Sequence, residues 1–359
     1  MIIFSLRYLH RAIPQPTFRR PSNLSSWFIV TDNEVFFMFP TIRPSRRTML
    51  GAAVSAVCGA YGNPAAAAAP PSVTTTSLPI PPRLQWDELD GYCGECSIQQ
   101  AALYFGTYVS QYACRAIINP NQKSQLLVAV NDQTVLTALR LTSAEFNYNQ
   151  ASSQQFAGYF GWVKQHIALK RPVLIVAYVK GLSDPDYDHI MLATGFTSSN
   201  STTYIATDRL YFNDCFSPSA NMRVASTLSD TRKMRVNGAK YEFCIPTNIC
   251  YGCAITGIND TSGAALPVQI QLASWSEPDV MAGAAPATLN ATVSVTGLIA
   301  GRSYSLYRYN NYQNVPTTNY ARSNYTSVVN FVASNPTATF PATVLSNGMA
   351  TFRCLPAGK

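Results

Sequence analysis

Histidine is scarce in this sequence, and charged residues are few. Three histidines, His10, His166 and His189, occur among 359 residues, and Lys, Arg, Asp and Glu together make up 12%. The hydrophobic content of 47% excludes a disordered chain and supplies enough apolar residues for at least two cores. Any chemistry that needs a histidine must therefore use one of these three residues.

Long apolar runs and basic clusters are also missing. No uninterrupted run reaches 18 apolar residues, so we expect no membrane span in the mature chain. The formal net charge is +8, but residues 1–71 hold seven Arg against Asp32 and Glu34 and supply +5 of it. Beyond them, the basic run at residues 232–235 is typical of a solvated loop. We therefore expect no nucleic-acid partner.

The N-terminal segment has the order of an export signal. Basic residues at 43–47 precede an apolar run at 49–58, and an alanine-rich stretch follows. A positive region, an apolar region and small residues in this order predict a signal peptide. We expect residues 1–70 to be a targeting region and the mature protein to be secreted or otherwise exported. A two-part signal for the plastid thylakoid lumen and a later translation start, at Met38 or Met49, stay open.

Cys93 stands at the start of a predicted helix. Apolar residues follow it with spacings of three and four, at Ile98, Ala101, Ala102, Phe105 and Val109. This spacing predicts a helix with one buried face. The partial positive charge and unpaired N–H groups of a helix N-terminus lower the pKa of a thiol, so Cys93 is expected to ionise near neutral pH. The pattern is typical of a cysteine nucleophile.

His189 is the best placed histidine to act as the base. His10 lies in the targeting region, and His166 lies on a predicted surface helix. His189 opens a predicted strand that follows the apolar, buried strand 172–179. A further strand ends at Asn213 and Asp214. Cysteine on a helix, histidine at the start of a strand and an acid at the end of the next strand is the order of a thiol protease triad.

These motifs together resemble a known enzyme family. The matching segments are Cys93-Gly94, Tyr104-Phe105-Gly106, Pro172-Val173, His189 to Gly195, and Asp214. They are similar to papain-fold cysteine peptidases of the double-glycine-leader, or bacteriocin-processing, type, over roughly residues 84–216. The resemblance implies a thiol hydrolase that cleaves peptide or isopeptide bonds in a peptide or protein substrate, with no cofactor and no metal. It implies catalytic roles for Cys93, His189 and Asp214.

The resemblance also implies an oxyanion donor before the nucleophile, and Gln85 is the only glutamine close upstream. The N–H of Cys93 or of Gly94 is the alternative donor. Papain itself has its nucleophile at the second cysteine of a Cys-Gly-x-Cys motif. By that alignment, Cys96 would be the nucleophile instead of Cys93. Asn213 is an alternative orienting residue.

A second rival acid and two other functions stay open. Asp208 could replace Asp214, although pairing with Arg209 or capping a turn is its expected use. The chain could be a papain-fold binding protein without activity. It could also be a thiol-disulfide oxidoreductase that uses Cys93 and Cys96.

Cysteine usage favours an oxidising destination. Once Cys58 is removed with the targeting region, eight cysteines remain, and we expect disulfides among them. Four sequons, at Asn200, Asn259, Asn290 and Asn324, would permit glycosylation. A zinc site made by the pairs Cys93/Cys96 and Cys250/Cys253 is the competing interpretation, but some 150 residues separate the two pairs, against the usual ~15–20.

The predicted fold is α+β with two domains. After an extended linker at residues 71–83, residues 84–258 are expected to form a papain-like domain, with a helical part packed on an antiparallel sheet. Residues 259–359 contain short alternating strands and turn signals and predict a small β-sandwich, similar to fibronectin type III modules. We expect the sandwich to be removable without unfolding the first domain.

Overall fold

The computed structural model describes residues 72–86, 91–121, 131–146, 155–179, 188–230, 243–247 and 250–358. They form helices and mostly antiparallel sheets, which confirms the predicted α+β class. The predicted targeting region, residues 1–70, lies outside the described residues. Part of the predicted linker is a strand, since β1 pairs with β5 in the main sheet.

The helices are α1 (Cys93–Tyr104), α2 (Gln111–Ile118), α3 (Asn131–Ala138), α4 (Phe156–Ala168) and α5 (Ala225–Leu228), with short 3-10 turns η2 (Tyr312–Asn314) and η3 (Tyr320–Arg322). The first ten strands are β1 (Thr74–Ser77), β2 (Thr107–Val109), β3 (Leu141–Phe146), β4 (Val173–Val179), β5 (Asp188–Ser198), β6 (Arg209–Asn213), β7 (Asn221–Val224), β8 (Ser229–Asp230), β9 (Phe243–Pro246) and β10 (Gly252–Ile258). The others are β11 (Val268–Leu272), β12 (Thr288–Thr296), β13 (Ser303–Tyr309), β14 (Ser327–Val332), β15 (Thr337–Leu345) and β16 (Met349–Pro356).

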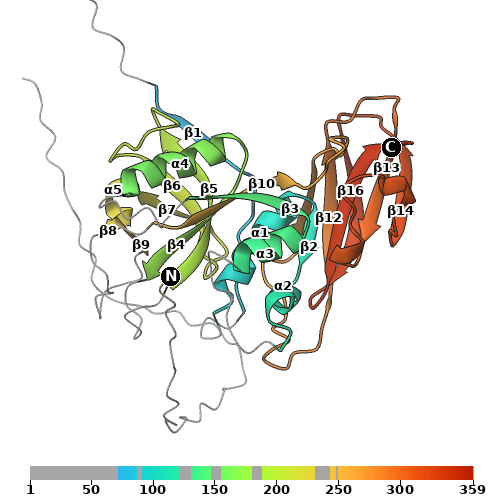
Figure 1. The fold of residues 1–359 in the computed structure, drawn as a ribbon, viewed down its shortest axis with the longest axis horizontal. Coiled ribbons are helices and arrows are strands. Elements are labelled where there is room, and N and C mark those ends of the chain that lie inside the picture. The colour runs from blue at the N-terminus through green and yellow to red at the C-terminus, as the bar shows by residue number, and fades with distance from the viewer. Residues whose placement is uncertain are drawn as a thin grey trace, which may run out of the picture. The chain divides into compact units, whose positions relative to one another are not determined.

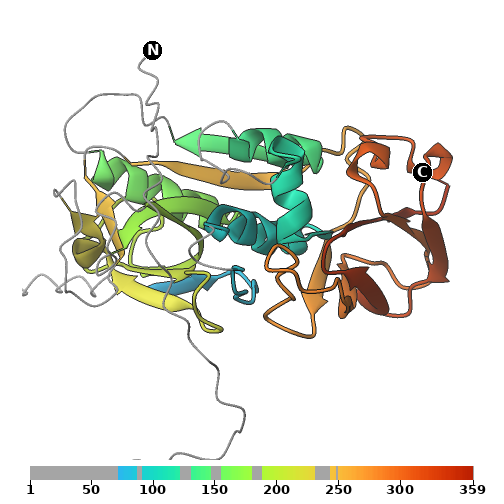
Figure 2. The ribbon, with the colours of Figure 1, turned by 90° about the horizontal axis from the view of Figure 1, so that it is seen from below.

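The main sheet has the order β3-β10-β4-β5-β6-β7. Strand β4 is the apolar run expected at its centre, and it pairs with β5 so that Ala177 lies opposite His189. Helix α4 packs against β5, β10 and β4 (Figure 1). The three helices α1, α2 and α3 pack on one another, as Figure 2 shows. Helix α1 also packs against β5, and His189, near the start of that strand, is fully buried.

Helix α1 begins at Cys93, as the sequence predicts, but it is not a half-exposed helix. Every residue from Cys93 to Leu103 is buried, including the polar residues Glu95, Gln99 and Gln100. A helix that is buried on all sides must satisfy its polar side chains with protein partners. These partners define the two polar clusters described below.

The C-terminal strands form two sheets, with the orders β11-β12-β15 and β14-β13-β16-β2. Their facing side chains make one apolar core, to which Val293, Val295, Leu306 and Cys354 contribute. Strands with buried and exposed residues in alternation, as in β12, are typical of sheets that pack face to face. A paired-sheet C-terminal region is therefore present.

Contacts cross the predicted boundary at residues 258/259. Strand β2 belongs to the first domain by sequence, yet it pairs with β16, with Val109 opposite Met349. Leu103 and Tyr108 contribute to the C-terminal core. Gly106 has a positive φ of 68°, and a Cβ there would lie 2.8 Å from Val268 Cβ. The glycine that closes the motif after α1 is thus needed for a close approach to β11.

Residues Ala68–Lys359 form one compact unit. Within the described part of the chain, none of the helices combines the length and the apolar character that a bilayer crossing requires.

Candidate active site

Cys93 is the first residue of α1, and its thiol lies beside the start of β5. Its side chain is 6% exposed. Its Sγ accepts a hydrogen bond from the Ile190 main-chain N–H at 3.4 Å. The two elements are further tied by Ser97, whose Oγ donates to the Ile190 carbonyl at 3.2 Å. Because Ile190 directly follows His189, the structure brings the predicted nucleophile and base into one small region.

His189 is completely buried, and its ring has a defined orientation. The ring stacks on Phe216 with centroids 4.2 Å apart and planes 11° apart. Its Nε2 lies 2.5 Å from the main-chain carbonyl oxygen of Asp214. A carbonyl oxygen can only accept, so Nε2 carries the proton and Nδ1 has the lone pair. The base of the predicted triad is therefore held in a single tautomer.

Asp214 reaches His189 through its main chain and not through its carboxylate. Its Oδ1 accepts from the N–H groups of Phe216, at 3.0 Å, and of Ser217, at 3.1 Å. Its Oδ2 accepts from the Asn221 side-chain amide. The carboxylate stabilises the turn between β6 and β7, and this turn holds the carbonyl against the imidazole. The orienting contact exists, but the atom that makes it differs from the expected one.

The two alternative orienting residues have other partners. Asn213 donates from Nδ2 to the Gln100 side-chain oxygen at 2.7 Å and to the Ile80 carbonyl at 3.1 Å. Asp208 forms an ion pair with Lys164 at 2.5 Å. Asp208 also accepts a hydrogen bond from the Ile205 N–H at 3.0 Å, as expected of a turn cap, whereas the expected pairing with Arg209 is replaced by a buried pair with a lysine of α4.

Cys96, the alternative nucleophile, is fully buried one turn into α1. Its Sγ donates to the Arg83 carbonyl at 3.4 Å. Gln100 donates to the same sulfur at 3.5 Å. Cys96 thus contacts Arg83 and Gln100, whereas Cys93 contacts Ile190, the residue after His189, so the geometry favours Cys93 as the thiol next to His189.

Gln85, the predicted oxyanion donor, is close to this region through Cys215. The Gln85 main-chain N–H donates to the Cys215 carbonyl at 2.9 Å. The Cys215 thiol in turn contacts the Cys93 carbonyl at 3.8 Å. The Gln85 side chain is 8% exposed, and neither its Nε2 nor its Oε1 has a hydrogen-bond partner among the described residues. Asp87 and Asp90, which separate it from Cys93, lie outside the described residues.

Burial controls the protonation of the site. Desolvation, with smaller contributions from Cys215 and Glu95, raises the pKa of Cys93 to about 12, because these effects outweigh the hydrogen bond from Ile190. Desolvation lowers the pKa of His189 to about 4. The expectation that Cys93 ionises near neutral pH is wrong in this arrangement, because removal from water opposes the helix N-terminus. At neutral pH the pair is a thiol and a neutral imidazole.

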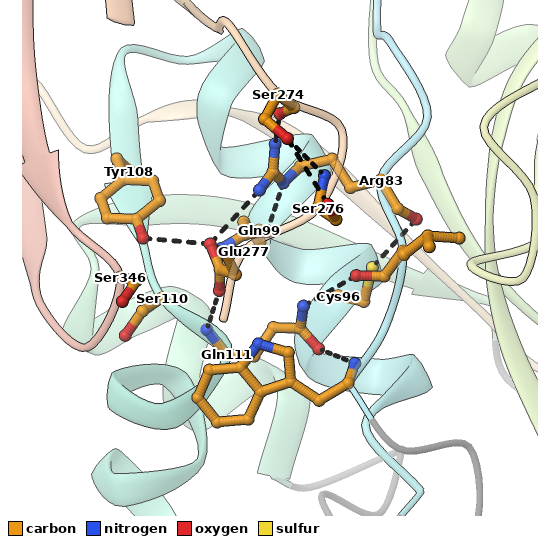
Figure 3. Close-up of polar contacts among 12 residues, drawn as sticks. Arg83, Cys96, Gln99, Tyr108, Ser110, Gln111, Ser274, Ser276, Glu277 and Ser346 are labelled. Carbon is orange, nitrogen blue, oxygen red and sulfur yellow. Dashed lines mark hydrogen bonds and ion pairs between the residues drawn. The ribbon is translucent and has the colours of Figure 1, made fainter. Parts of the chain in front are cut away.

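A second polar cluster lies further along α1, and sequence reasoning missed it. Glu277, from the segment between β11 and β12, forms an ion pair with Arg83 at 3.3 Å (Figure 3). Its carboxylate also accepts from Gln99 Nε2 at 3.2 Å, from the Tyr108 hydroxyl at 3.1 Å and from the Gln111 N–H at 3.3 Å. No local signal marks Glu277, because these partners lie between 166 and 194 residues away in the chain.

This Glu277 cluster also fixes the segment that carries Gln85. The Leu84 N–H donates to the Trp275 carbonyl at 3.0 Å. On the other side, the Gln111 side chain donates to the Leu84 carbonyl and accepts from the Trp86 N–H, each at 2.9 Å. The main chain around Gln85 is therefore held in place on both sides. Its side-chain amide forms no hydrogen bond with any described residue.

The eight cysteines of the described residues are all buried, and none is in a disulfide. Within the same residues there is no group of three or more His, Cys, Asp and Glu side chains that could hold a metal ion. The two cysteine pairs of the zinc interpretation are thus not brought together as a four-ligand site.

Comparison with known protein families, with curated proteins and with solved structures finds no match to this chain.

Proposed function

We propose that the protein is a thiol hydrolase that cleaves peptide or isopeptide bonds, with Cys93 as nucleophile and His189 as general base. The observation that carries the proposal is the hydrogen bond from the Ile190 N–H to the Cys93 Sγ. It holds the thiol against the main chain of the residue that follows His189. The motif order that resembles double-glycine-leader peptidases supports the same assignment, as does the packing of α1, which carries the thiol, against β5 of the main sheet.

The neutral resting pair sets the first step of the mechanism. His189 takes the Cys93 proton at Nδ1 while the sulfur attacks the substrate carbonyl, because no thiolate is present beforehand. The Asp214 carbonyl keeps the other ring proton on Nε2 during this transfer. It stabilises the imidazolium less than a carboxylate would, since it carries only a partial charge.

The remaining steps use the same groups. The imidazolium returns its proton to the leaving amine, which departs and leaves an acyl-thioester on Cys93. Water, deprotonated by His189, then hydrolyses the thioester and regenerates the thiol. The Gln85 side-chain amide is the proposed donor to the oxyanion of both tetrahedral intermediates. It is buried, and its N–H groups donate no hydrogen bond to any described residue. The N–H of Cys93 is the second donor.

Thiol labelling tests the assignment without knowledge of the substrate. The folded protein is treated at neutral pH with a peptidyl electrophile that targets cysteine peptidases, and the modified peptide is located by mass spectrometry. We expect modification of Cys93, loss of label in Cys93→Ala and slower labelling in His189→Ala. Cys114→Ser is the matched control, because Cys114 is also buried but lies in α2. Label on Cys96 instead would overturn the choice of nucleophile.

The burial of Cys93 favours a second candidate, a papain-fold binding protein without activity. A thiol that is 6% exposed and has a pKa of about 12 is a poor nucleophile unless a substrate displaces the groups around it. The same labelling experiment separates the two candidates. A binding protein would leave Cys93 unmodified in the folded state and modified only after denaturation.

A further inference from the structure

Two buried cysteines outside the proposed dyad lie together between α1 and the end of β6. Gln100 Nε2 donates to the Cys96 Sγ at 3.5 Å and to the Cys215 Sγ at 3.3 Å. Burial raises the pKa of the Cys215 thiol, and the neighbouring Cys96 thiol raises it further. Both residues are fully buried. One amide nitrogen thus holds two sulfurs that come from positions more than a hundred residues apart in the chain.

Cys215 occupies a special position in the backbone. It has a positive φ of 64°, which is rare for a residue other than glycine. Its thiol contacts Ser97 Oγ at 3.4 Å and the Cys93 carbonyl at 3.8 Å, so its side chain faces the first turn of α1. The turn that carries Cys215 is therefore held with its sulfur pointing at the helix that carries Cys96.

We propose that Cys96 and Cys215 are a redox pair that forms a disulfide under oxidising conditions and so links α1 to the turn after β6. A metal ion is not the better explanation, because no third ligand joins the two sulfurs among the described residues. The proposal concerns the pair alone and does not depend on Cys93 being a nucleophile.

The reaction needs an oxidant, and a low-molecular-weight disulfide such as oxidised glutathione supplies it. One cysteine, as thiolate, attacks the oxidant disulfide, which forms a mixed disulfide and releases one glutathione thiolate. The second cysteine attacks the mixed disulfide, so the Cys96–Cys215 bond forms and a second glutathione leaves. Two protons are lost from the cysteines and taken up by the two glutathiones, and the two electrons reside in the reduced glutathione.

Burial determines when the reaction occurs. Neither sulfur is accessible in the folded chain, and desolvation raises the pKa of Cys215 well above its usual value. Both effects slow attack by a thiolate in the native state. The disulfide is therefore expected to form during folding, while the thiols still contact water.

The test is oxidative refolding of the full chain in oxidised and reduced glutathione, in a Cys93→Ala background that removes the neighbouring thiol. The refolded protein is then denatured so that buried free thiols are alkylated, and peptides are analysed by mass spectrometry without reduction. We expect one cross-linked peptide pair, Cys96 with Cys215. We also expect the midpoint of thermal unfolding to lie on the order of 5 °C above that of the reduced protein.

Variants make the result specific. Cys96→Ser and Cys215→Ser should each abolish the cross-link, whereas Cys114→Ser should keep it. If Cys215→Ser fails to fold, Cys96→Ser alone decides, since its α1 position has no backbone strain. The proposal is overturned if both thiols of the refolded, oxidised protein become alkylated once it is denatured, or if either sulfur is found bonded to a different cysteine.

Discussion

Two buried polar clusters lie along helix α1, and they differ in charge and in how completely they are bonded. The Glu277 cluster contains an ion pair, and its carboxylate has partners on Arg83, Gln99, Tyr108 and Gln111. The Cys93 region contains a thiol and an imidazole that are neutral near pH 7. Beside it, the Gln85 amide has no partner among the described residues.

The difference indicates different roles. A buried charge is tolerated only when paired and hydrogen-bonded, so the Glu277 cluster has the bonding expected of a structural junction. A buried amide without a hydrogen-bond partner destabilises the folded state by about 1–3 kcal/mol. We expect such a group where a ligand supplies the missing hydrogen bond. The two clusters therefore give opposite expectations for activity and for stability, and substitutions in each can test this.

Removal of the nucleophile should have the largest effect. Cys93→Ala is expected to lower hydrolysis of any peptide amide that the unmodified protein cleaves by at least about 10³-fold, because it removes the thiol that contacts the start of β5. Cys96→Ser should keep most of the activity. Equal losses in the two variants, measured as kcat/KM, would contradict a single nucleophile at Cys93.

Glu277→Ala should affect stability more than any single change in the Cys93 region. It leaves the Arg83 guanidinium buried without its ion-pair partner, which costs about 3–5 kcal/mol of unfolding free energy. Urea unfolding measures the loss, and Glu277→Gln, which keeps the shape and some hydrogen bonds, should lose less. A cost below about 1 kcal/mol would show that the cluster is not the junction described here.

Deletion of residues 259–359 extends this test to the whole junction. The sequence predicts a removable C-terminal region, but β2 would lose its partner strand, and Leu103 and Tyr108 would lose their apolar cover. We therefore expect the shortened chain to aggregate or to unfold without cooperativity in thermal melts. A soluble chain with a sharp transition would restore the boundary at 258/259.

Gln85→Ala should lower activity and leave stability nearly unchanged, whereas Glu277→Ala should mainly lower stability. Loss of one oxyanion donor typically lowers kcat about 10²–10³-fold, equivalent to about 2.7–4 kcal/mol in the transition state. KM and the free energy of unfolding should change little, because the amide has no described protein partner. A loss that appears wholly in stability would make Gln85 a structural residue.

The smallest effect is a pH dependence of stability that arises from His189. Its pKa is about 4 in the folded chain, below the ordinary 6.5, so the unfolded chain binds more protons between these values. Stability is therefore unaffected above about pH 6.5 and falls as the pH decreases, by about 1.4 kcal/mol at pH 5.5. His189→Gln should flatten the urea-unfolding curve over this range, apart from a remainder due to His166, whose pKa is also lowered by burial.

Local patterns predicted the elements but not the long-range contacts. The start of α1 at Cys93, the buried strand β4 and the position of His189 in β5 follow from apolar spacing, which depends on neighbours a few residues away. The use of the Asp214 carbonyl, in place of its carboxylate, follows from turn geometry that composition does not reveal. Glu277 and β2 could not be predicted, because their partners lie far away in the chain.

Strand β2 has a consequence for the nascent chain. The Arg353 side chain donates to the Phe105 carbonyl across 248 residues, so the end of α1 leaves the ribosome long before its partner is synthesised. Until β16 emerges, the apolar side chains of β2 and of the end of α1 remain exposed, which is the condition that recruits chaperones. The helix that carries the thiols is thus completed early in translation and acquires its native surroundings only near the end of it.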